Sequence, residues 1–399
     1  MSRKFSASWI LPLDRPPLKN GIVTVDSDGT ILEVTDTGGN LKEQERLEYH
    51  GGLLVPGFVN AHCHLELSWM KNRIQEKTGL VAFIGELNKI RKTGSEKECL
   101  QAAQMADARM FHDGISLVGD ISNSSITAGI KKNSQIFWYN FVEVFGFHPS
   151  RASRAIEMAR VIWEEYNHWG LKASIVPHAP YSVSPQLFCL LNHQDITTGS
   201  IISMHNQESV DEDLLFRSGD GSLPDHYKEN LGLDISHWKP TGFSSLRSVL
   251  QWLPSDRNLL LVHNTYMGEE DLKHLRESRD PDKTFLVLCP GANQYIEDSL
   301  PPIKLFREYG MNICLGTDSL ASNNQLSMIK EMFILQESFP ELHLTELLTW
   351  ACLSGARALG MEHQFGTITP GKKPGLVLIK GADLAEMRLT GRSLAKRLV

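Results

Sequence analysis

The stretch Val55–Ser68 reads VPGFVNAHCHLELS and carries two histidines, His62 and His64, shortly after an apolar run. Along a β-strand, side chains two residues apart project from the same face. The His-Cys-His pattern therefore predicts two imidazoles on one face of a strand end, with Cys63 on the other face. Two neutral ring nitrogens arranged in this way suit a zinc-like ion.

The apolar run beside this motif, Leu53–Val59, is the first of eight that alternate with polar loops and helical patterns. The other seven are Ile115–Val118, Ile136–Val144, Ala173–Val176, Ile201–Met204, Leu259–Val262, Phe285–Leu288 and Asn312–Leu315. The clearest helical patterns are Leu80–Arg91, Glu96–Phe111, Arg154–Trp169 and Met328–Gln336. Eight alternating units predict an α/β fold with a (β/α)8 barrel of the TIM type. An open doubly wound sheet is the competing fold, but no GxGxxG motif follows any of the runs.

Most of the apolar runs end on or near a polar, often ionisable side chain. These side chains are His62 and His64, Asp120, Glu143, His178, His205, His263 and Asp318, and the run Phe285–Leu288 leads into Cys289–Asn293. The carboxyl ends of barrel strands share one face, where catalytic residues collect. Three histidines and one aspartate, from the first, fifth and eighth runs, are therefore candidate metal ligands. They are His62, His64, His205 and Asp318.

Two further residues near the strand ends are candidates for catalysis. Glu208 lies three residues after His205, where it can face a metal-activated water and carry its proton without ligating the metal. His263 ends the sixth run and is a candidate to hold the attacking oxygen or the developing tetrahedral centre. Considered alone, Glu208 is equally an exposed loop acid and His263 equally a structural core histidine.

The two ends of the chain have a different pattern from the barrel. Residues 17–36 contain short apolar stretches broken by Asn-Gly and Asp-Gly pairs, which favour hairpin turns, and residues 366–380 look similar. We expect residues 1–55 and 365–399 to form one small composite β-sandwich domain. Residues 56–364 then form the barrel domain.

The composition excludes several classes of protein. The chain has 399 residues, of which 41% are hydrophobic and 22% charged, and its net charge is −7. This mildly acidic balance gives no electrostatic footprint for nucleic acid or anionic lipid, and no apolar stretch is long enough to span a membrane. The six cysteines include no CxxC pair, which fits a reducing compartment. We expect a cytoplasmic protein with a small-molecule substrate and no nucleic-acid or membrane partner.

An ordered set of motifs resembles the amidohydrolase superfamily over essentially the whole chain. The motifs are VPGFVNAHCHLELS, PHAPYS, HNQES, LVHN, CPGAN and GTDS. Within the superfamily they are most similar to the cytosine/guanine/adenosine-type deaminases and chlorohydrolases. The resemblance implies a barrel with a small β-sandwich built from both termini, and a homodimer would be unsurprising for this family. One departure is Gly291-Ala292, where members often have an Arg-Ser pair.

The resemblance also implies a division of roles among the candidate residues. One divalent metal, with Zn²⁺ favoured over Fe²⁺ or Mn²⁺, would be held by His62, His64, His205 and Asp318. Glu208 would shuttle protons, His263 would orient the attacking hydroxide, and Asp318 would also accept a proton from it. Because the fourth run ends at His178 and not at a lysine, one metal is expected instead of two.

The implied reaction is attack of a metal-activated water on an amine-bearing ring carbon, with loss of ammonia. His64–Ser68, residues 79–92 and residues 316–323 are similar to aminodeoxyfutalosine deaminases, which convert 6-aminodeoxyfutalosine to futalosine in an alternative menaquinone pathway. That resemblance implies substrate contacts from the PHAPYS segment, with His178 and Tyr181, and from Glu66 to ribose hydroxyls. Arg73 or Lys71 would meet the benzoate carboxylate, for which a bidentate arginine is the better partner.

Other functions remain open on the sequence. One alternative is another heterocycle or nucleoside deaminase, acting on guanine, adenosine or S-adenosylhomocysteine. A second is hydrolysis of a cyclic amide or a chloro-substituted ring, and a third is a non-catalytic binding protein on a barrel scaffold. The long connection 209–250 is expected to cover the substrate, with Phe216 or Trp238 near the ligand.

Overall fold

The computed structural model describes residues 2–192 and 201–399. Eight of its strands form two four-stranded parallel sheets. The first sheet contains β6 (Phe58–Cys63), β7 (Ile115–Ser122), β8 (Phe137–Val144) and β9 (Lys172–Pro177). The second contains β10 (Ile202–Asn206), β11 (Leu259–His263), β12 (Thr284–Leu288) and β13 (Asn312–Leu315).

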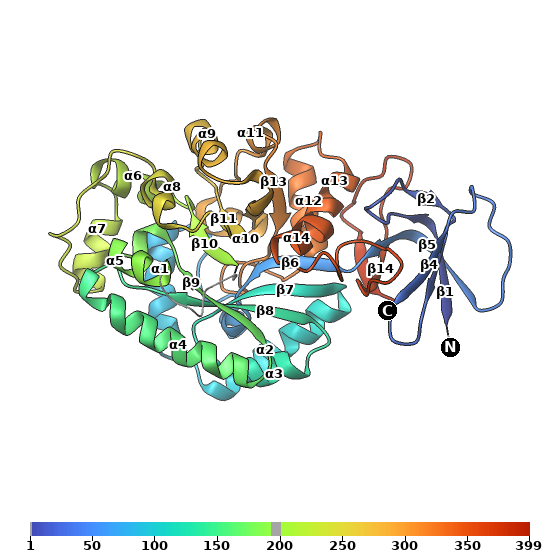
Figure 1. The fold of residues 1–399 in the computed structure, drawn as a ribbon, viewed down its shortest axis with the longest axis horizontal. Coiled ribbons are helices and arrows are strands. Elements are labelled where there is room, and N and C mark those ends of the chain that lie inside the picture. Colours follow the sequence, from blue (N-terminus) through green and yellow to red (C-terminus); the bar gives the residue numbers. More distant parts are fainter. Residues whose placement is uncertain (1, 193–200) are drawn as a thin grey trace.

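The two parallel sheets meet edge to edge on both sides. Cys63, at the end of β6, forms a parallel bridge with Asp318, which follows β13. On the other side, the backbone N–H of His205 in β10 donates to the carbonyl oxygen of His178, just after β9, at 2.8 Å. The strands therefore close into the (β/α)8 barrel that the eight apolar runs predict, and helices surround it (Figure 1).

Helices connect the barrel strands and cover their outer faces (Figure 1). The α-helices are α1 (Leu80–Arg91), α2 (Glu96–His112), α3 (Ala128–Asn133), α4 (Ala152–His168), α5 (Pro185–Asn192), α6 (Val210–Ser218), α7 (Leu223–Asp225), α8 (Ser245–Val249), α9 (Glu269–Ser278), α10 (Pro290–Glu297), α11 (Ile303–Glu308), α12 (Met328–Ser338), α13 (Leu344–Thr349) and α14 (Gly355–Ala358). Shorter 3₁₀ or π segments are η1 (Leu65–Met70), η2 (Pro149–Arg151), η3 (Pro180–Ser182), η5 (His226–Asn230), η6 (Leu250–Trp252), η7 (Pro281–Lys283) and η8 (Trp350–Ser354). The four predicted helical patterns correspond to α1, α2, α4 and α12.

A seven-stranded sheet contains strands from both ends of the chain and lies beside the barrel (Figure 1). Its strands are β1 (Arg3–Ile10), β2 (Leu18–Lys19), β3 (Ile22–Val25), β4 (Ile31–Thr35), β5 (Leu47–Pro56), β14 (Leu376–Lys380) and β15 (Leu394–Arg397). β5 pairs with β1 in parallel and with β14 antiparallel, so the C-terminal segment completes the N-terminal sheet. The predicted sandwich and its domain boundaries at residues 55 and 365 stay predictions.

The prediction for the first barrel strand is wrong in its N-terminal half. Leu53–Pro56 belong to β5 of the terminal sheet, and the barrel strand β6 begins only at Phe58. The C-terminal half of β5 and all of β6 are buried, so their apolar residues run together in the sequence. Gly57 marks the boundary, where a Cβ would lie only 1.9 Å from the Ser116 hydroxyl oxygen.

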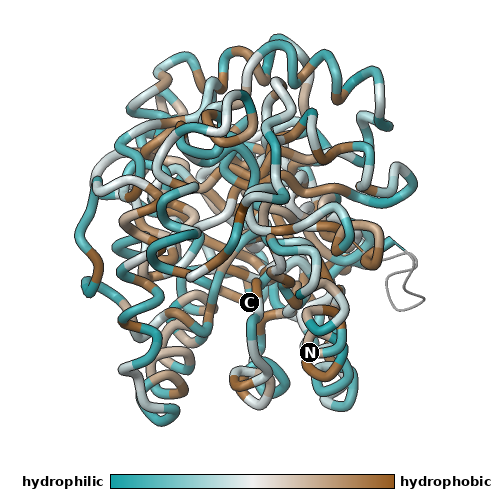
Figure 2. The backbone as a smooth tube through the Cα atoms, turned by 90° about the vertical axis from the view of Figure 1, so that its left-hand side faces the viewer, coloured by the Kyte–Doolittle hydropathy of each residue, from teal (hydrophilic) through white to brown (hydrophobic). Residues whose placement is uncertain are grey.

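The hydrophobic residues concentrate inside the barrel and on the inner helix faces, while hydrophilic residues dominate the outer helix faces (Figure 2). Helix α4 illustrates the pattern, since Ile156, Ala159 and Tyr166 are buried, whereas Arg154, Glu157 and Glu164 are exposed. Among the helices of residues 2–192 and 201–399, none is long and apolar enough to cross a membrane.

Candidate active site

A cavity of about 350 Å³ lies at the carboxyl ends of the barrel strands. Strand-end residues such as His64, His205 and Asp318 line it, and α1 and residues 223–231 form walls. This volume lies within the range of small-molecule sites in proteins. The cavity therefore occupies the place where a barrel of this type carries its active site.

Four of the predicted metal ligands converge at this cavity. His62 Nε2 and His64 Nε2 lie 3.2 Å apart, and Asp318 Oδ1 lies 3.3 Å from His64 Nε2 and 3.8 Å from His62 Nε2. Candidate ligand atoms of His62, His64 and His205 all lie within 4.8 Å of one another. Two nitrogens bound to one tetrahedral zinc lie about 3.3 Å apart. The spacing therefore fits a single divalent metal held by these side chains.

The charge states of the cluster also suit a metal. Burial lowers the pKa of His62 well below its ordinary value, and burial likewise lowers the pKa of His64. Burial alone would raise the pKa of Asp318, but His64 and its neighbours lower it below the ordinary value. Ser322 Oγ donates to Asp318 Oδ2 at 2.7 Å, which leaves Oδ1 facing the imidazoles. His62 and His64 thus offer neutral imidazoles and Asp318 a carboxylate, as a divalent metal requires. Burial alone would lower the pKa of His205, but Glu143 raises it to about 9, so a metal that binds this ring displaces a proton from it.

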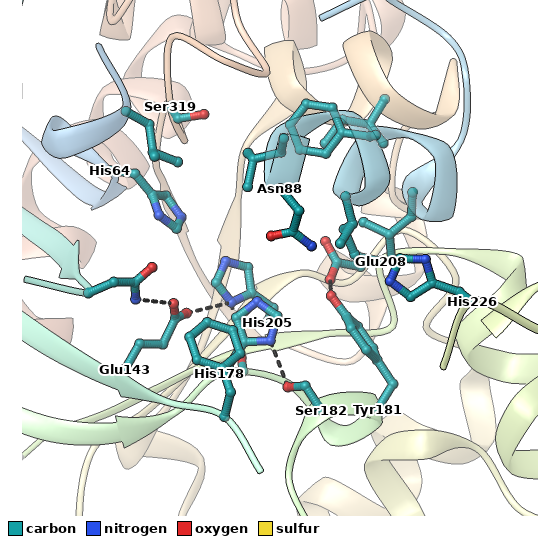
Figure 3. Close-up of a pocket in the computed structure, with 18 of the residues that line it drawn as sticks. His64, Asn88, Glu143, His178, Tyr181, Ser182, His205, Glu208, His226 and Ser319 are labelled. Atoms are coloured by element: carbon teal, nitrogen blue, oxygen red, sulfur yellow. Dashed lines mark hydrogen bonds and ion pairs between the residues drawn. The ribbon is translucent and has the colours of Figure 1, made fainter. Parts of the chain in front are cut away.

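Glu143, at the end of β8, orients the third histidine and was not predicted as a site residue. His205 Nδ1 lies 3.0 Å from the His178 carbonyl oxygen and 3.3 Å from Glu143 Oε1. A carbonyl only accepts, so Nδ1 of His205 carries a proton, and Nε2 is the nitrogen left to bind a metal. Asn123 Nδ2 donates to Glu143 Oε2 at 2.9 Å (Figure 3). The only sequence signal for Glu143 was its place at the end of the third apolar run.

Glu208 is held on two sides. Tyr181 Oη donates to Glu208 Oε1 at 2.6 Å, and His263 Nε2 lies 3.6 Å from Glu208 Oε2. Burial, reinforced by Glu208, raises the pKa of Tyr181 well above its ordinary value, so the phenol keeps the proton that it donates. Figure 3 shows this pair on the opposite side of the cavity from His64. The carboxylate predicted to carry protons is therefore buried and fixed in place.

His263 is held by a residue of helix α10 and has an unusual backbone conformation. Its Nδ1 lies 2.8 Å from Oδ1 of Asn293, which can only accept, so Nδ1 carries the proton and Nε2 faces Glu208. His263 and Asp318 have backbone φ angles of +73° and +57°. Non-glycine residues rarely adopt this conformation, and it concentrates at functional sites.

Two predicted substrate contacts line the cavity, His178 and Tyr181. His178 Nδ1 lies 2.7 Å from Ser182 Oγ, and that hydroxyl donates to the Ala179 carbonyl. The hydroxyl proton is thus committed, so His178 Nδ1 is the donor and its Nε2 is an acceptor. Burial lowers the pKa of His178 to about 3, which keeps this ring neutral.

The structure does not bring Glu66, Lys71 or Arg73 to the cavity. Glu66 is buried beside the wall, where its Oε2 accepts from the Asn123 backbone N–H at 3.3 Å and from the Ser124 hydroxyl at 3.0 Å. Arg73 pairs with Glu98 and lies over the Trp69 ring at 4.8 Å. Lys71 is exposed and does not line the cavity. Among the described residues, Arg91 is the one arginine or lysine that lines this cavity.

The long connection after β10 does form a wall of the cavity, but with other residues than expected. Leu223, His226, Tyr227 and Leu231 line it. Phe216 instead packs edge-on against Trp238, with ring centroids 5.5 Å apart, and neither ring reaches the cavity lining. Aromatic residues in a long loop carry no sequence signal for which of them faces inward.

Gly291 occupies a place where a side chain has no room. A Cβ at this position would lie 2.6 Å from Asn323 Nδ2 and 2.8 Å from Glu331 Oε1. The buried Glu331 accepts from the Gly291 backbone N–H at 2.7 Å and from Asn323 Nδ2 at 2.8 Å. This carboxyl thus bridges the segment after β12 to the loop after β13, near the candidate metal ligand Asp318.

A family model described as "Amidohydrolase family" matches residues 53–395. Among curated proteins, an adenosine deaminase of Helicobacter pylori is 28% identical over 88% of this chain and 85% of its own length. A 5-methylthioadenosine/S-adenosylhomocysteine deaminase of Saccharophagus degradans is 24% identical over 96% and 84%. An aminodeoxyfutalosine deaminase of Deinococcus radiodurans is also 24% identical, over 87% and 85%.

Solved structures share the fold. An aminofutalosine deaminase of Helicobacter pylori, in complex with methylthio-coformycin, superposes with a TM-score of 0.81 at 23% identity and covers 100% of both chains. An adenosine deaminase of Xanthomonas campestris with bound zinc superposes with a TM-score of 0.74 at 22% identity, over 94% of this chain and 84% of its own.

Proposed function

Because the chain belongs to the amidohydrolase family and the relatives above are named as nucleoside deaminases, we propose that it hydrolytically deaminates 6-aminodeoxyfutalosine to futalosine. The enzyme class is a hydrolase that acts on C–N bonds other than peptide bonds. The observation that carries the proposal is the position of Glu208, held by Tyr181 and His263 in the cavity that the histidine and aspartate cluster also lines.

The metal of this proposal is one Zn²⁺ ion per chain. His62, His64, His205 and Asp318 would hold it, since their donor atoms and spacing fit. When bound, such an ion supplies Lewis acidity and lowers the pKa of water at the site from 15.7 toward about 7. The zinc in the Xanthomonas campestris deaminase supports this choice over iron or manganese.

The protein's own side chains move the protons. Glu208 takes one proton from the attacking water as the new C–O bond forms and returns it to a ring nitrogen of the substrate. Asp318 accepts the second proton and passes it to the exocyclic nitrogen as the C–N bond breaks and ammonia leaves. Tyr181 fixes one carboxylate oxygen of Glu208, so the other is the one that exchanges protons. His263, whose Nδ1 carries the proton, presents Nε2 on the same side as an acceptor that orients the attacking water. His178 offers a neutral acceptor nitrogen to the ring.

The substrate assignment rests on the resemblance of residues 64–68, 79–92 and 316–323 and on the names of the relatives. A second candidate is deamination of adenosine, 5′-methylthioadenosine or S-adenosylhomocysteine, which the names of other relatives favour. If 6-aminodeoxyfutalosine is the substrate, the enzyme acts in menaquinone biosynthesis.

Ammonia release by the zinc-loaded protein tests the proposal. The substrates are 6-aminodeoxyfutalosine, adenosine, 5′-methylthioadenosine, S-adenosylhomocysteine and guanine, each run against the Glu208→Gln variant as a blank. The proposal expects the highest kcat/KM with 6-aminodeoxyfutalosine. A higher value with another nucleoside would replace the substrate but keep the deaminase, and no ammonia from any of them would contradict the deaminase itself.

A further inference from the structure

Helix α1 presents one face to the active-site cavity. The cavity-lining residues of this helix are Leu80, Phe83, Ile84, Leu87, Asn88 and Arg91. Steps of three and four residues place side chains on the same side of a helix, so these residues form a single stripe. The stripe changes character along its length, from four apolar side chains to an amide and then to a guanidinium.

The stripe crosses the barrel mouth. At one end, the Leu80 backbone N–H donates to Glu297 Oε1 of α10 at 2.7 Å. At the other end, Arg91 Nη2 donates to Asn123 Oδ1, just after β7, at 2.9 Å. The eleven residue steps between them span about 16 Å at 1.5 Å per residue. This length accommodates a nucleoside and a further substituent, and Figure 3 shows Asn88 projecting between His64 and Glu208.

Arg91 keeps hydrogen-bonding capacity for a ligand. Its side chain is 39% exposed, and its Nη2 forms an ion pair with the buried Glu66, 3.6 Å from Oε1. Among the described residues, Asn123 accepts a hydrogen bond from Nη2 of this guanidinium. Its Nε and Nη1 are left as donors for a ligand. Of the described residues that line the cavity, Arg91 is the one lysine or arginine, whereas Glu208 and Asp318 lie at the candidate metal site and disfavour an anion there. The Arg91 end of the stripe is therefore where an anionic group is best placed.

We propose that Arg91 binds a carboxylate at the distal end of the substrate, while the apolar part of the α1 stripe packs against its rings. A guanidinium fork matches a carboxylate in geometry and charge. The inference rests on the proposed function, because 6-aminodeoxyfutalosine carries a benzoate carboxylate whereas adenosine and 5′-methylthioadenosine carry none. It also replaces Arg73, which the sequence favoured for this role, by a residue that lines the cavity. Arg91 is thus a specificity-determining residue.

The test compares two substrates in matched variants. We measure kcat/KM for 6-aminodeoxyfutalosine and for 5′-methylthioadenosine in the wild type, Arg91→Gln, Arg91→Lys and the control Arg73→Gln. The ratio of kcat/KM for 6-aminodeoxyfutalosine to kcat/KM for 5′-methylthioadenosine falls about 10- to 100-fold in Arg91→Gln, as expected for the loss of hydrogen bonds to a charged group. Arg91→Lys restores part of the ratio, and Arg73→Gln keeps it. An equal loss for both substrates in Arg91→Gln, or a lower ratio in Arg73→Gln, overturns the proposal.

A binding measurement separates this inference from the proposed function. Calorimetry with futalosine, which keeps the carboxylate and lacks the reactive amine, gives a Kd that does not depend on turnover. A Kd at least tenfold weaker in Arg91→Gln than in the wild type supports the role of Arg91 even if no nucleoside is deaminated. An unchanged Kd, or no binding of futalosine to the wild type, rejects it.

Discussion

The phenol oxygen of Tyr181 lies 2.6 Å from Oε1 of Glu208, and the burial of both residues makes this contact a fixed part of the cavity. Tyr181 comes from the loop after β9 and Glu208 from the loop after β10, so neighbouring strands bring the pair together. Because Tyr181 keeps its proton, it is always a donor to Glu208. Oε1 of Glu208 therefore accepts the hydrogen bond that fixes the side chain, and Oε2 remains available for proton transfer.

Replacing Tyr181 by Phe removes this hydrogen bond with little change in volume. A hydrogen bond to a charged group contributes about 1.5–3 kcal/mol, so we expect kcat for ammonia release to fall about 10- to 100-fold. Metal content, measured by elemental analysis, stays at one ion per chain, because Tyr181 contacts none of the proposed ligand atoms. A kcat within twofold of the wild type would show that Glu208 does not need this partner.

Glu143→Gln tests the support of His205. The variant keeps the shape of the side chain but removes the charge that lies 3.3 Å from His205 Nδ1. Mutating such a partner of a metal-binding histidine costs about 10- to 100-fold in metal affinity. Competition with a chromophoric chelator measures zinc affinity directly, with Glu157→Gln on the exposed face of α4 as the control. The role assigned to Glu143 fails if both variants bind zinc as tightly as the wild type.

Removing the metal lowers stability as well as activity. An ion that binds only the folded chain stabilises it, by about 2.7 kcal/mol at a hundredfold excess over Kd. Dialysis against a chelator is therefore expected to abolish ammonia release and to lower Tm, and added zinc restores both. Equal Tm values with and without bound zinc would contradict the assignment of these ligands to one ion.

Glu331 makes stability depend on pH. Burial raises the pKa of this carboxyl to about 8, from an ordinary value of 4.5. In the folded protein it stays protonated up to about pH 8, whereas the unfolded chain loses this proton above pH 4.5. Its contribution to stability is thus complete below pH 4.5 and is lost as the pH rises to about 8, by up to about 1.4 kcal/mol per pH unit.

Urea denaturation of the wild type and Glu331→Gln at pH 6 and pH 8 checks this dependence. Glutamine stays neutral, so the free energy of unfolding of the variant rises relative to that of the wild type between the two pH values. Glu337→Gln, on the exposed face of the same helix, provides the control and keeps a constant difference. A constant difference for Glu331→Gln as well would mean that this carboxyl is ionised in the folded protein.

The barrel was predictable because its strands are buried on both faces. Continuous apolar runs such as Leu259–Val262 are visible in the sequence, and seven of the eight runs begin within one residue of the start of a barrel strand. The prediction of one barrel strand at Leu53–Val59 was wrong in part, because burial alone does not show which sheet a strand joins. The closure of the barrel between Cys63 and Asp318 depends on contacts 255 residues apart in the sequence, which no local pattern encodes.

The site was predictable where backbone position decides it. His62, His64, His205 and Asp318 end barrel strands, so the fold alone brings them together. Arg73 and Arg91 both lie in the connection between β6 and β7. The partners of their side chains determine which of the two reaches the cavity. Glu98 and Trp69 hold Arg73 away from the cavity, and this pairing has no sequence signal. The role of Glu143 could not be predicted either, because it depends on the carboxylate pointing toward His205.

The most direct test of the proposed function is ammonia release by zinc-loaded wild type and Glu208→Gln with 6-aminodeoxyfutalosine. Removing a positioned acid–base group costs about 10²- to 10⁴-fold in rate, and Glu208 is not among the proposed ligands. The account therefore predicts a loss of at least a hundredfold in kcat with one zinc per chain in both proteins. A variant that binds zinc fully and keeps its kcat within tenfold of the wild type would contradict it.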